Sequence, residues 1–441
     1  MDKLLIYCAQ QSNRLHYIFD ELLHTYLGID YQLTNHWDAF IANKNIPRLI
    51  YASSAIQVSS LPFLKANPFI FENHIRSITP QIAQWQGMTT LFPNEQEDDQ
   101  FPFDLFSAAF FLLSRYEEYL PFEADQHGRF PATASIAYQH NFLHLPIIQH
   151  WCMAFAKYLQ AYYPKLSVEY PSYTFIPTYD IDYAWSYLHK PILRQVGAMS
   201  REMAKGQWKR LLERAKVYSG NKKDPFDIYQ QLDQWHTAYQ LYPIFFFLLG
   251  DQNTYDKNIP HTNTTFQNLI QDITQQSEVG IHPSYQSNSD NDTLEKEISR
   301  LKNIIQQDIT KSRQHYLKLS FPKTYHCLRQ LGIHEDYSMG YAAAIGFRAG
   351  TALPFYWYDL TTDQVTDLKV FPFQLMDVSL KDYLRLSPNK AKESIQQIIE
   401  QCKQVGGTFI PLWHNSSFSE LDGWEGWKAV YEYLLAQATS V

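Results

Sequence analysis

From Ser172 to the C-terminus, short apolar runs typical of buried β-strands alternate with segments of helical periodicity. The run Ile244–Leu249 is long enough for a strand that is buried on both faces. A later segment places Leu294, Ile298 and Leu301 on one helical face. Buried strands separated by helices of this length favour parallel pairing, because a crossover helix returns the chain to the same end of the sheet. The pattern therefore predicts a parallel α/β architecture, either a barrel or a doubly wound sheet.

The first 168 residues have a different pattern and are predicted to form a separate α/β or α+β domain of unknown role. Leu4–Cys8 and Arg48–Ala52 are predicted strands, while Leu105–Tyr119 and Leu145–Tyr163 carry the apolar stripes of helices. This region has no metal-ligand or nucleophile spacing, and His127–Arg129 is interpreted as a polar turn. Residues 169–441 then form the second domain. Its further predicted strands are Tyr173–Ile176, Val279–His282, Tyr316–Leu319, Lys369–Val378 and Thr408–Trp413.

Charge is distributed unevenly along the chain. The formal net charge of −8 argues against a nucleic-acid partner, because polyanions are repelled. Residues 188–223 are an exception, with ten Lys or Arg against two Glu and apolar residues between them. We interpret this segment as a basic helical insertion. It is either a solvated helical face or a contact for an anionic membrane or a phosphate-bearing glycan carrier.

The spacing of the cysteines and the length of the N-terminal apolar run indicate which cellular compartment to expect. Cys8, Cys152, Cys327 and Cys402 lie far apart and form no zinc-ribbon or redox spacing, which suits free thiols in a reducing compartment. The N-terminal apolar run is shorter than the core of a signal peptide. We therefore expect a cytoplasmic protein. The high aromatic content, 16%, fits either an aromatic-rich core or faces that stack on sugars.

Ionisable residues follow several of the predicted strands. Asp180 and Asp182 end the first strand of the second domain, and His282 ends another. Two carboxylates one residue apart on an extended chain point the same way, and such a pair needs a cation or a proton nearby. The carboxyl ends of parallel strands meet at one face, where functional groups gather. The sequence thus predicts a shared site, and the Asp-x-Asp pair with distant histidines suggests a metal.

The same residues resemble the motifs of the polysaccharide deacetylases of the nodulation-deacetylase type, carbohydrate esterase family four. Thr178–Asp182 (TYDID) is similar to the family's Thr-Phe-Asp-Asp motif, and Gly280–Gln286 (GIHPSYQ) keeps the first histidine of its His-x-x-x-His motif. Arg313 fits the arginine motif, and Pro411–His414 (PLWH) loosely matches the final Leu-x-Leu-His. The resemblance covers about Ser172–Leu435. It points to a bacterial subgroup with an uncharacterised N-terminal domain and implies a distorted (β/α) barrel for residues 169–441.

The resemblance also implies roles for these residues. Asp182 and His282 would hold a divalent metal, with zinc expected, and Asp180 would be the general base. His414 would be the general acid, and Arg313 would orient Asp180 and keep it ionised. Gln286 stands where the family has its second histidine, so His315 is a candidate third ligand. Predicted substrate contacts are Tyr285, Arg348, Trp413 and Asn415, and Asp377 is a candidate partner of His414.

The leading functional hypothesis is a hydrolase that removes an N-acetyl or other acyl group from a sugar, breaking a carbon–nitrogen amide bond with metal-activated water. Its substrate would be a bacterial glycan or a lipid-linked glycan precursor. A second hypothesis is an inactive barrel that binds glycan or a partner protein, supported by Gln286. A third is a glycoside hydrolase that uses Asp180 or Asp182 with Asp377, although two Asp one residue apart fit neither carboxylate spacing of such enzymes.

Overall fold

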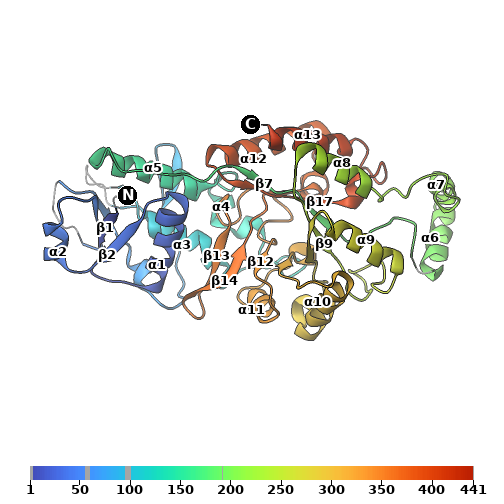
Figure 1. Ribbon diagram of the computed structural model, residues 1–441, viewed down its shortest axis with the longest axis horizontal. Coiled ribbons are helices and arrows are strands. Elements are labelled where there is room, and N and C mark those ends of the chain that lie inside the picture. The colour runs from blue at the N-terminus through green and yellow to red at the C-terminus, as the bar shows by residue number, and fades with distance from the viewer. Residues whose placement is uncertain (1–2, 55–59, 95–100, 191, 441) are drawn as a thin grey trace.

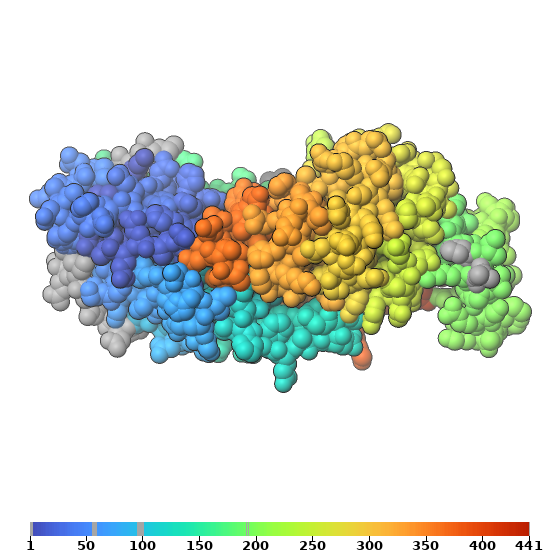
Figure 2. Space-filling model, turned by 90° about the horizontal axis from the view of Figure 1, so that it is seen from below, coloured from blue at the N-terminus to red at the C-terminus, as the bar shows by residue number. Residues whose placement is uncertain are grey.

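The structure is a computed structural model that describes residues 3–54, 60–94, 101–190 and 192–440. The molecule is elongated, with the N-terminal region at one end and a pair of helices projecting at the other (Figure 1). A large sheet and its helices lie between them. A view of another face shows residues of the N-terminal region running along the side of the later part of the chain (Figure 2).

The N-terminal region contains a parallel four-stranded sheet, in the order β2-β1-β3-β4, together with an antiparallel hairpin. The predicted strands at Leu4–Cys8 and Arg48–Ala52 are confirmed. Its strands are β1 (Leu4–Tyr7), β2 (Tyr31–Thr34), β3 (Arg48–Ala52), β4 (Phe63–Lys65), β5 (Ile82–Trp85) and β6 (Met88–Leu91). Its helices are α1 (Asn13–Phe19), continued by a π-helical segment Asp20–Tyr26, α2 (Trp37–Ala42), α3 (Leu105–Leu113), α4 (Ile136–Gln139) and α5 (Ile147–Tyr162).

Nine of the described strands form the second sheet, in the order β13-β14-β12-β11-β10-β9-β8-β17-β15. All neighbours pair in parallel except β13 and β14. The strands are β8 (Thr178–Ile181), β9 (Ile244–Phe247), β10 (Glu278–Ile281), β11 (Lys311–Ser312), β12 (Glu335–Asp336), β13 (Phe355–Asp359), β14 (Gln364–Val370), β15 (Leu375–Met376) and β17 (Pro411–His414). The short strands β7 (Thr174–Phe175) and β16 (Thr408–Phe409) pair separately.

Alternate residues of the second sheet enter two different clusters. Phe245 and Phe247 of β9 pack in the large core, whereas Ile244 and Phe246 join a smaller cluster that also holds Met376 of β15. Because β9 and β15 lie three strands apart in the sheet order, a shared cluster means that the sheet curls around it. The sheet is nevertheless open, with β13 and β15 at its edges among the described strands. The α/β class is confirmed, and the closed barrel is not.

Helices lie between successive strands from β8 to β12 and between β15 and β16, as the alternating pattern predicted, whereas the described segment from β12 to β15 contains none. The helices of this region are α6 (Ile192–Ala204), α7 (Trp208–Tyr218), α8 (Tyr229–Tyr239), α9 (Thr264–Thr274), α10 (Asn291–Ile305), α11 (Lys323–Gln330), α12 (Pro388–Gln404) and α13 (Trp427–Thr439). The stripe of Leu294, Ile298 and Leu301 is buried in the large core, which explains why α10 forms there. The strand predicted at Tyr316–Leu319 is wrong. Tyr316 and Leu317 have φ of 58° and 54°, a left-handed conformation that breaks a strand.

A network of buried ion pairs joins the two regions of the chain. Glu118 accepts hydrogen bonds from Arg115, at 2.8 Å, and from Arg348, at 2.6 Å. The guanidinium of Arg115 also contacts Glu117 and the backbone carbonyl of Arg348. All three charged groups of the Arg115–Glu118–Arg348 network are almost fully buried. The large core likewise contains residues from both regions, so the two pack as one body.

Removing the shared anion should therefore destabilise the whole chain. In Glu118→Ala, two buried guanidinium groups lose their main counter-charge, and an uncompensated buried charge costs about 3–5 kcal/mol. We expect the midpoint of urea unfolding, followed by far-UV circular dichroism, to fall accordingly. The matched control is Glu72→Ala, which breaks the half-exposed pair between Glu72 and Arg76 and should change stability by less than about 1 kcal/mol. If the two substitutions lowered the stability equally, the buried network would not make the large contribution to stability that we propose.

Candidate active site

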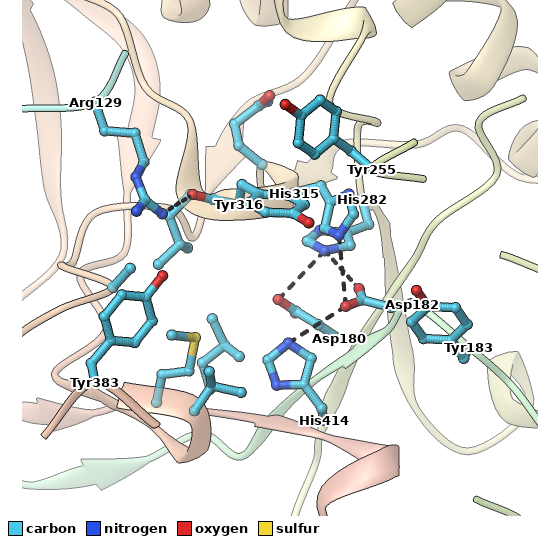
Figure 3. Close-up of a pocket in the computed structure, with 16 residues that line it drawn as sticks. Arg129, Asp180, Asp182, Tyr183, Tyr255, His282, His315, Tyr316, Tyr383 and His414 are labelled. Atoms are coloured by element: carbon cyan, nitrogen blue, oxygen red, sulfur yellow. Dashed lines mark hydrogen bonds and ion pairs between the residues drawn. The ribbon is translucent and has the colours of Figure 1, made fainter. Parts of the chain in front are cut away.

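Functional side chains from five segments converge at the carboxyl ends of the parallel strands. Asp180 and Asp182 follow from β8, His282 follows β10, and Arg313 and His315 follow β11. On the other side of β8, His414 ends β17 and Asp377 follows β15. This is the end of a parallel sheet at which sites form, because the strand termini leave room and the loops meet there. Figure 3 shows the carboxylates and imidazoles directed into one pocket.

Asp182 lies at the centre of three imidazoles. Its carboxylate oxygens are 3.2 Å from His282 Nε2, 3.6 Å from His315 Nε2 and 3.8 Å from His414 Nε2. One ligand atom from each of Asp182, His282 and His315 lies within 4.8 Å of the others. The Oδ1 atom of Asp182 is buried and accepts no hydrogen bond. A buried oxygen without a hydrogen-bond donor, close to the Nε2 atom of His282, fits a cation ligand.

The two histidines beside Asp182 are oriented by groups behind them. The Nδ1 atom of His282 bonds the backbone carbonyl of Arg313, and Nδ1 of His315 lies 2.7 Å from Asp256 Oδ1. Both Nε2 atoms are thereby directed toward Asp182. A hydrogen bond of this kind at the remote ring nitrogen fixes the tautomer that metal-binding histidines need. The described residues thus offer one carboxylate and two imidazoles, a three-ligand set that suits a catalytic divalent cation such as zinc.

The same contacts shift the ionisation of these groups. Burial acts to lower the pKa of His315, but the carboxylates of Asp182 and Asp256 outweigh it and raise that pKa to about 9. Burial acts to raise the pKa of Asp182, whereas the neighbouring histidines hold it well below its usual value. In the absence of a cation, the site is therefore a tight cluster of paired charges. A bound cation replaces the imidazolium protons as the counter-charge of Asp182.

Asp180 is buried beside the cluster and is paired with Arg313. The Nη1 atom of Arg313 donates to Asp180 Oδ1 at 3.0 Å and to the hydroxyl of Thr178 at 2.8 Å. The guanidinium carbon lies 4.6 Å from the ring centroid of Phe246, which fixes its plane. The second carboxylate oxygen, Oδ2, lies 3.7 Å from His282 Nε2. Arg313 thus places a permanent cation beside this buried carboxylate, whose second oxygen still faces the pocket.

His414 approaches the pocket from the opposite side of β8. Its Nδ1 atom lies 2.8 Å from Asp377 Oδ1, and its backbone N–H donates to Asp377 Oδ2 at 2.7 Å. The prediction that Asp377 pairs with His414 is confirmed. Burial acts to lower the pKa of His414, but Asp377, Asp182 and Asp180 together raise it to about 10. The imidazole is therefore a protonated group whose Nε2–H faces the pocket.

The pocket has a volume of about 240 Å³ and aromatic walls. Tyr183, Tyr255, Tyr316 and Tyr383 line it together with Arg129. In Figure 3, Arg129 and Tyr383 lie at the side away from Asp182. Arg129 belongs to the loop that was interpreted as a polar turn, yet its guanidinium donates to the carbonyl of Tyr316 at 2.6 Å. The N-terminal region thus contributes directly to the pocket wall, which the sequence did not indicate.

Two predicted substrate contacts are not supported. Trp413 is fully buried and packs against Tyr431, with ring centroids 5.0 Å apart. Because successive residues of a strand point to opposite faces, Trp413 faces the large core while His414 faces the pocket. Asn415 is also buried, and its amide donates to the carbonyl of Tyr183 at 2.9 Å. Asn415 therefore holds the loop after β8 and leaves no amide hydrogen for a sugar hydroxyl.

The other predicted contacts lie at the edge of the pocket or beyond it. Tyr285 stacks on Tyr255, with ring centroids 4.1 Å apart, so it supports a residue that lines the pocket. Arg348 lines an adjoining cavity, although its guanidinium is engaged by Glu118. Gln286 is exposed and does not line the pocket. His315, which follows the next strand and was the candidate third ligand, lies together with Asp182 and His282.

Comparison with known proteins divides the chain in two. Residues 4–164 match a model described as a family of unknown function (DUF7033). A search of curated proteins returns no match. Among solved structures, the chain is similar to a protein from Mycobacterium smegmatis described as a polysaccharide deacetylase, with 16% identity and a TM-score of 0.40. That match covers 62% of this chain and 85% of the other.

Two further similar structures differ in function from the first. One is a 4-alpha-glucanotransferase from Thermococcus litoralis, with 13% identity, a TM-score of 0.35, and coverage of 62% of this chain and 38% of the other. The other is a pseudoenzyme of carbohydrate esterase family four from Bacillus anthracis, with 11% identity, a TM-score of 0.28, and coverage of 49% and 58%.

The ligand set can be tested by metal content. Elemental analysis of the purified chain should find close to one divalent ion per chain, and Asp182→Ala, His282→Ala and His315→Ala should each lose it. Asp256→Asn, which removes the group behind His315, should weaken metal affinity by about 10–100-fold. The matched control is Gln286→Ala, which should retain the ion because this side chain lies outside the pocket. Metal lost in Gln286→Ala but kept in His315→Ala would overturn the assignment.

Proposed function

We propose that this chain is a metal-dependent carbohydrate deacetylase that hydrolyses an N-acyl group on a sugar of a bacterial glycan or glycan precursor. One observation carries the proposal. Asp182, His282 and His315 form a three-ligand set, while a paired carboxylate (Asp180) and a protonated imidazole (His414) face the same pocket from β8 and from β17. Amide hydrolysis needs three groups: a cation that polarises the carbonyl, a base that takes the proton of the attacking water, and an acid that protonates the leaving amine.

The residues supply complementary steps of the reaction. A divalent cation held by Asp182, His282 and His315 would polarise the acyl carbonyl and lower the pKa of water from 15.7 toward about 7. Asp180 accepts the proton of the attacking water, and Arg313 holds this carboxylate in place. His414 donates its Nε2 proton to the amine nitrogen as the carbon–nitrogen bond breaks. The products are the free amino sugar and the carboxylic acid, so one water molecule is consumed.

His414 and Asp377 act as a unit in this scheme. The carboxylate of Asp377 keeps His414 protonated and directs its Nε2–H toward the pocket. Without that support, the imidazole would lose the largest of the interactions that raise its pKa and the contact that sets its orientation. Asp377 is thus a positioning residue whose effect on catalysis passes entirely through His414.

Removing the proposed general acid, His414, should lower the rate of deacetylation without loss of the bound metal. For His414→Asn we expect acetate release from N-acetylated glucosamine oligomers to fall about 10²–10⁴-fold in kcat, the usual contribution of a general acid. Metal content should stay unchanged, and Asp377→Asn should show the same pattern more weakly. The matched control is His334→Asn, an exposed histidine outside the pocket, which should retain full activity. Wild-type protein that is loaded with metal and releases no acetate from any N-acetylated oligomer would contradict the proposal.

The competing functions have less support from the site. The hypothesis of an inactive binding protein rested on Gln286, and His315 now offers the ligand that this position lacks. A glycoside hydrolase would need two free carboxylates across the sugar. Here Asp377 is engaged with His414, and Asp180 with Arg313. Zinc as the metal, a lipid-linked substrate and a cytoplasmic location all stay predictions.

The pocket continues into a second cavity, which supports a substrate of more than one sugar. The second cavity, about 310 Å³, shares Arg129, Leu317, Ala342 and Tyr383 with the first. Its remaining wall includes Asp125 and Gln126 from the N-terminal region. Polar groups and aromatic faces in one groove match the hydroxyls and the apolar C–H faces of a sugar. The neighbouring unit of the glycan would therefore lie between the two regions of the chain.

Tyr383 lies where the two cavities meet, so it should matter for longer substrates. We expect Tyr383→Ala to raise KM for N-acetylated oligosaccharides about tenfold, because stacking on one aromatic face contributes about 1 kcal/mol or more. The KM for the monosaccharide should change less. The matched control is Tyr356→Ala, which removes a tyrosine of almost equal exposure, 44% against 43%, on β13. An equal rise of KM for both substrate lengths would contradict a separate second subsite.

A further inference from the structure

The helices α6 and α7 form a hairpin that projects from the body of the molecule. The two helices pack against each other and are joined by a short turn at residues 205–207. In Figure 1 they stand apart from the sheet and its covering helices, and Figure 2 shows them as a separate green lobe. The basic helical insertion predicted at residues 188–223 is this α6–α7 hairpin. None of the described helices is long and apolar enough to cross a bilayer.

Polar contacts fix the hairpin from within and at its base. Arg214 of α7 is buried against Glu202 of α6, with Nε 3.2 Å from Oε2. At the base, the buried carboxylate of Asp224 accepts the backbone N–H groups of Ser186 and Tyr187, at 2.7 and 2.8 Å. A charged pair and a carboxylate clamp, not a large apolar core, therefore hold the hairpin in place.

The larger apolar side chains of the hairpin face solvent. On α6, Ile192, Val196, Met199 and Met203 recur at helical spacing and form one exposed stripe. On α7, Trp208 and Leu212 lie one turn apart and are 62% and 63% exposed. Exposed apolar residues are ordinary when scattered, but two stripes on one small projection mark a binding surface.

Charge identifies the partner of this surface. Residues 188–223 contribute a formal charge of +8, although the whole chain carries −8. Lys209 and Lys216 are exposed and adjoin the α7 stripe, since Lys209 follows Trp208 and Lys216 lies one turn after Leu212. Lys205 is exposed at the turn. A helix with Trp and Leu on one side and lysines beside them is typical of segments that lie in the interface of an anionic bilayer.

We infer that the α6–α7 hairpin docks the protein on an anionic lipid bilayer. The apolar stripes would enter the boundary between headgroups and acyl chains, and the lysines would contact lipid phosphates. A second copy of the chain is a poorer partner, because pairing two hairpins through these faces would bring two segments of charge +8 together.

Docking would also place the pocket near the lipid surface. Tyr183 lines the pocket and precedes the hairpin by only a few residues. The ammonium of Lys190, at the base of the hairpin, lies 5.6 Å from the ring centroid of Tyr183. A membrane-attached hairpin would thus present the pocket to glycans carried at that surface. This last step rests on the proposed deacetylase function, whereas the docking itself does not.

Vesicle co-sedimentation of the full chain tests the inference without any need for turnover. We expect binding to phosphatidylcholine vesicles that contain phosphatidylglycerol, weaker binding at high salt, and little binding to phosphatidylcholine alone. The triple variant Lys205→Gln, Lys209→Gln, Lys216→Gln should bind at least about tenfold more weakly, since each lysine near an anionic surface contributes roughly a fivefold factor. The double variant Trp208→Ser, Leu212→Ser should lose binding to a similar degree.

Matched substitutions on the body of the molecule serve as controls. Lys157→Gln, Lys165→Gln, Lys296→Gln removes three exposed lysines elsewhere, and Tyr242→Ser, Val365→Ser removes two exposed apolar side chains. Both should bind vesicles like the wild type. Wild-type protein that does not bind anionic vesicles would overturn the inference, as would hairpin variants that bind like the controls. A wild-type dimer that Trp208→Ser dissociates would assign the surface to self-association. Hairpin variants should keep full activity on a soluble oligosaccharide, which separates docking from the proposed catalysis.

Discussion

The site is built around two carboxylates that stand one residue apart at the end of β8. Asp180 and Asp182 point to the same side of the strand, where both approach the imidazole of His282 and their like charges repel. Each needs a compensating charge close by. Arg313 supplies it for Asp180, and the ring of imidazoles around Asp182 supplies it for the second carboxylate.

Strand order then divides the chemistry between the two sides of β8. The strands β9, β10 and β11 lie on one side. The segments after these strands carry the two histidine ligands and Asp256, which contacts His315. On the other side, β17 and β15 carry His414 and Asp377. In the proposed reaction, the metal ligands and the proton donor His414 therefore lie on opposite sides of β8, the strand that carries the base Asp180. A scissile amide between them would meet each group from a different direction, as the transition state requires.

The sequence was sufficient to predict the site residues that lie at the ends of strands. It predicted Asp180, Asp182, His282 and His414 together, because the ends of parallel strands meet at one face, whereas Arg313 was assigned through the resemblance to the arginine motif. It missed Asp256, which lies in the loop after β9 with no motif around it. It also misjudged Trp413, although the two-residue period of a strand already implies that a neighbour of His414 points the other way. Contacts made by irregular loops leave no periodic signal, and only the folded chain reveals them.

The N-terminal region belongs to the site because it contacts irregular loops there. Contacts of this kind could not be predicted from the sequence. Tyr316 and Leu317 both adopt the left-handed conformation, which costs roughly 1–2 kcal/mol per residue. Arg129, from the N-terminal region, donates to the carbonyl of Tyr316 at the centre of that turn. The buried Arg115–Glu118–Arg348 network anchors the segment near Ala342, which also lines the pocket. Two parts of the pocket lining thus contact residues of the first region, so that region is a structural part of the pocket and not an appended module.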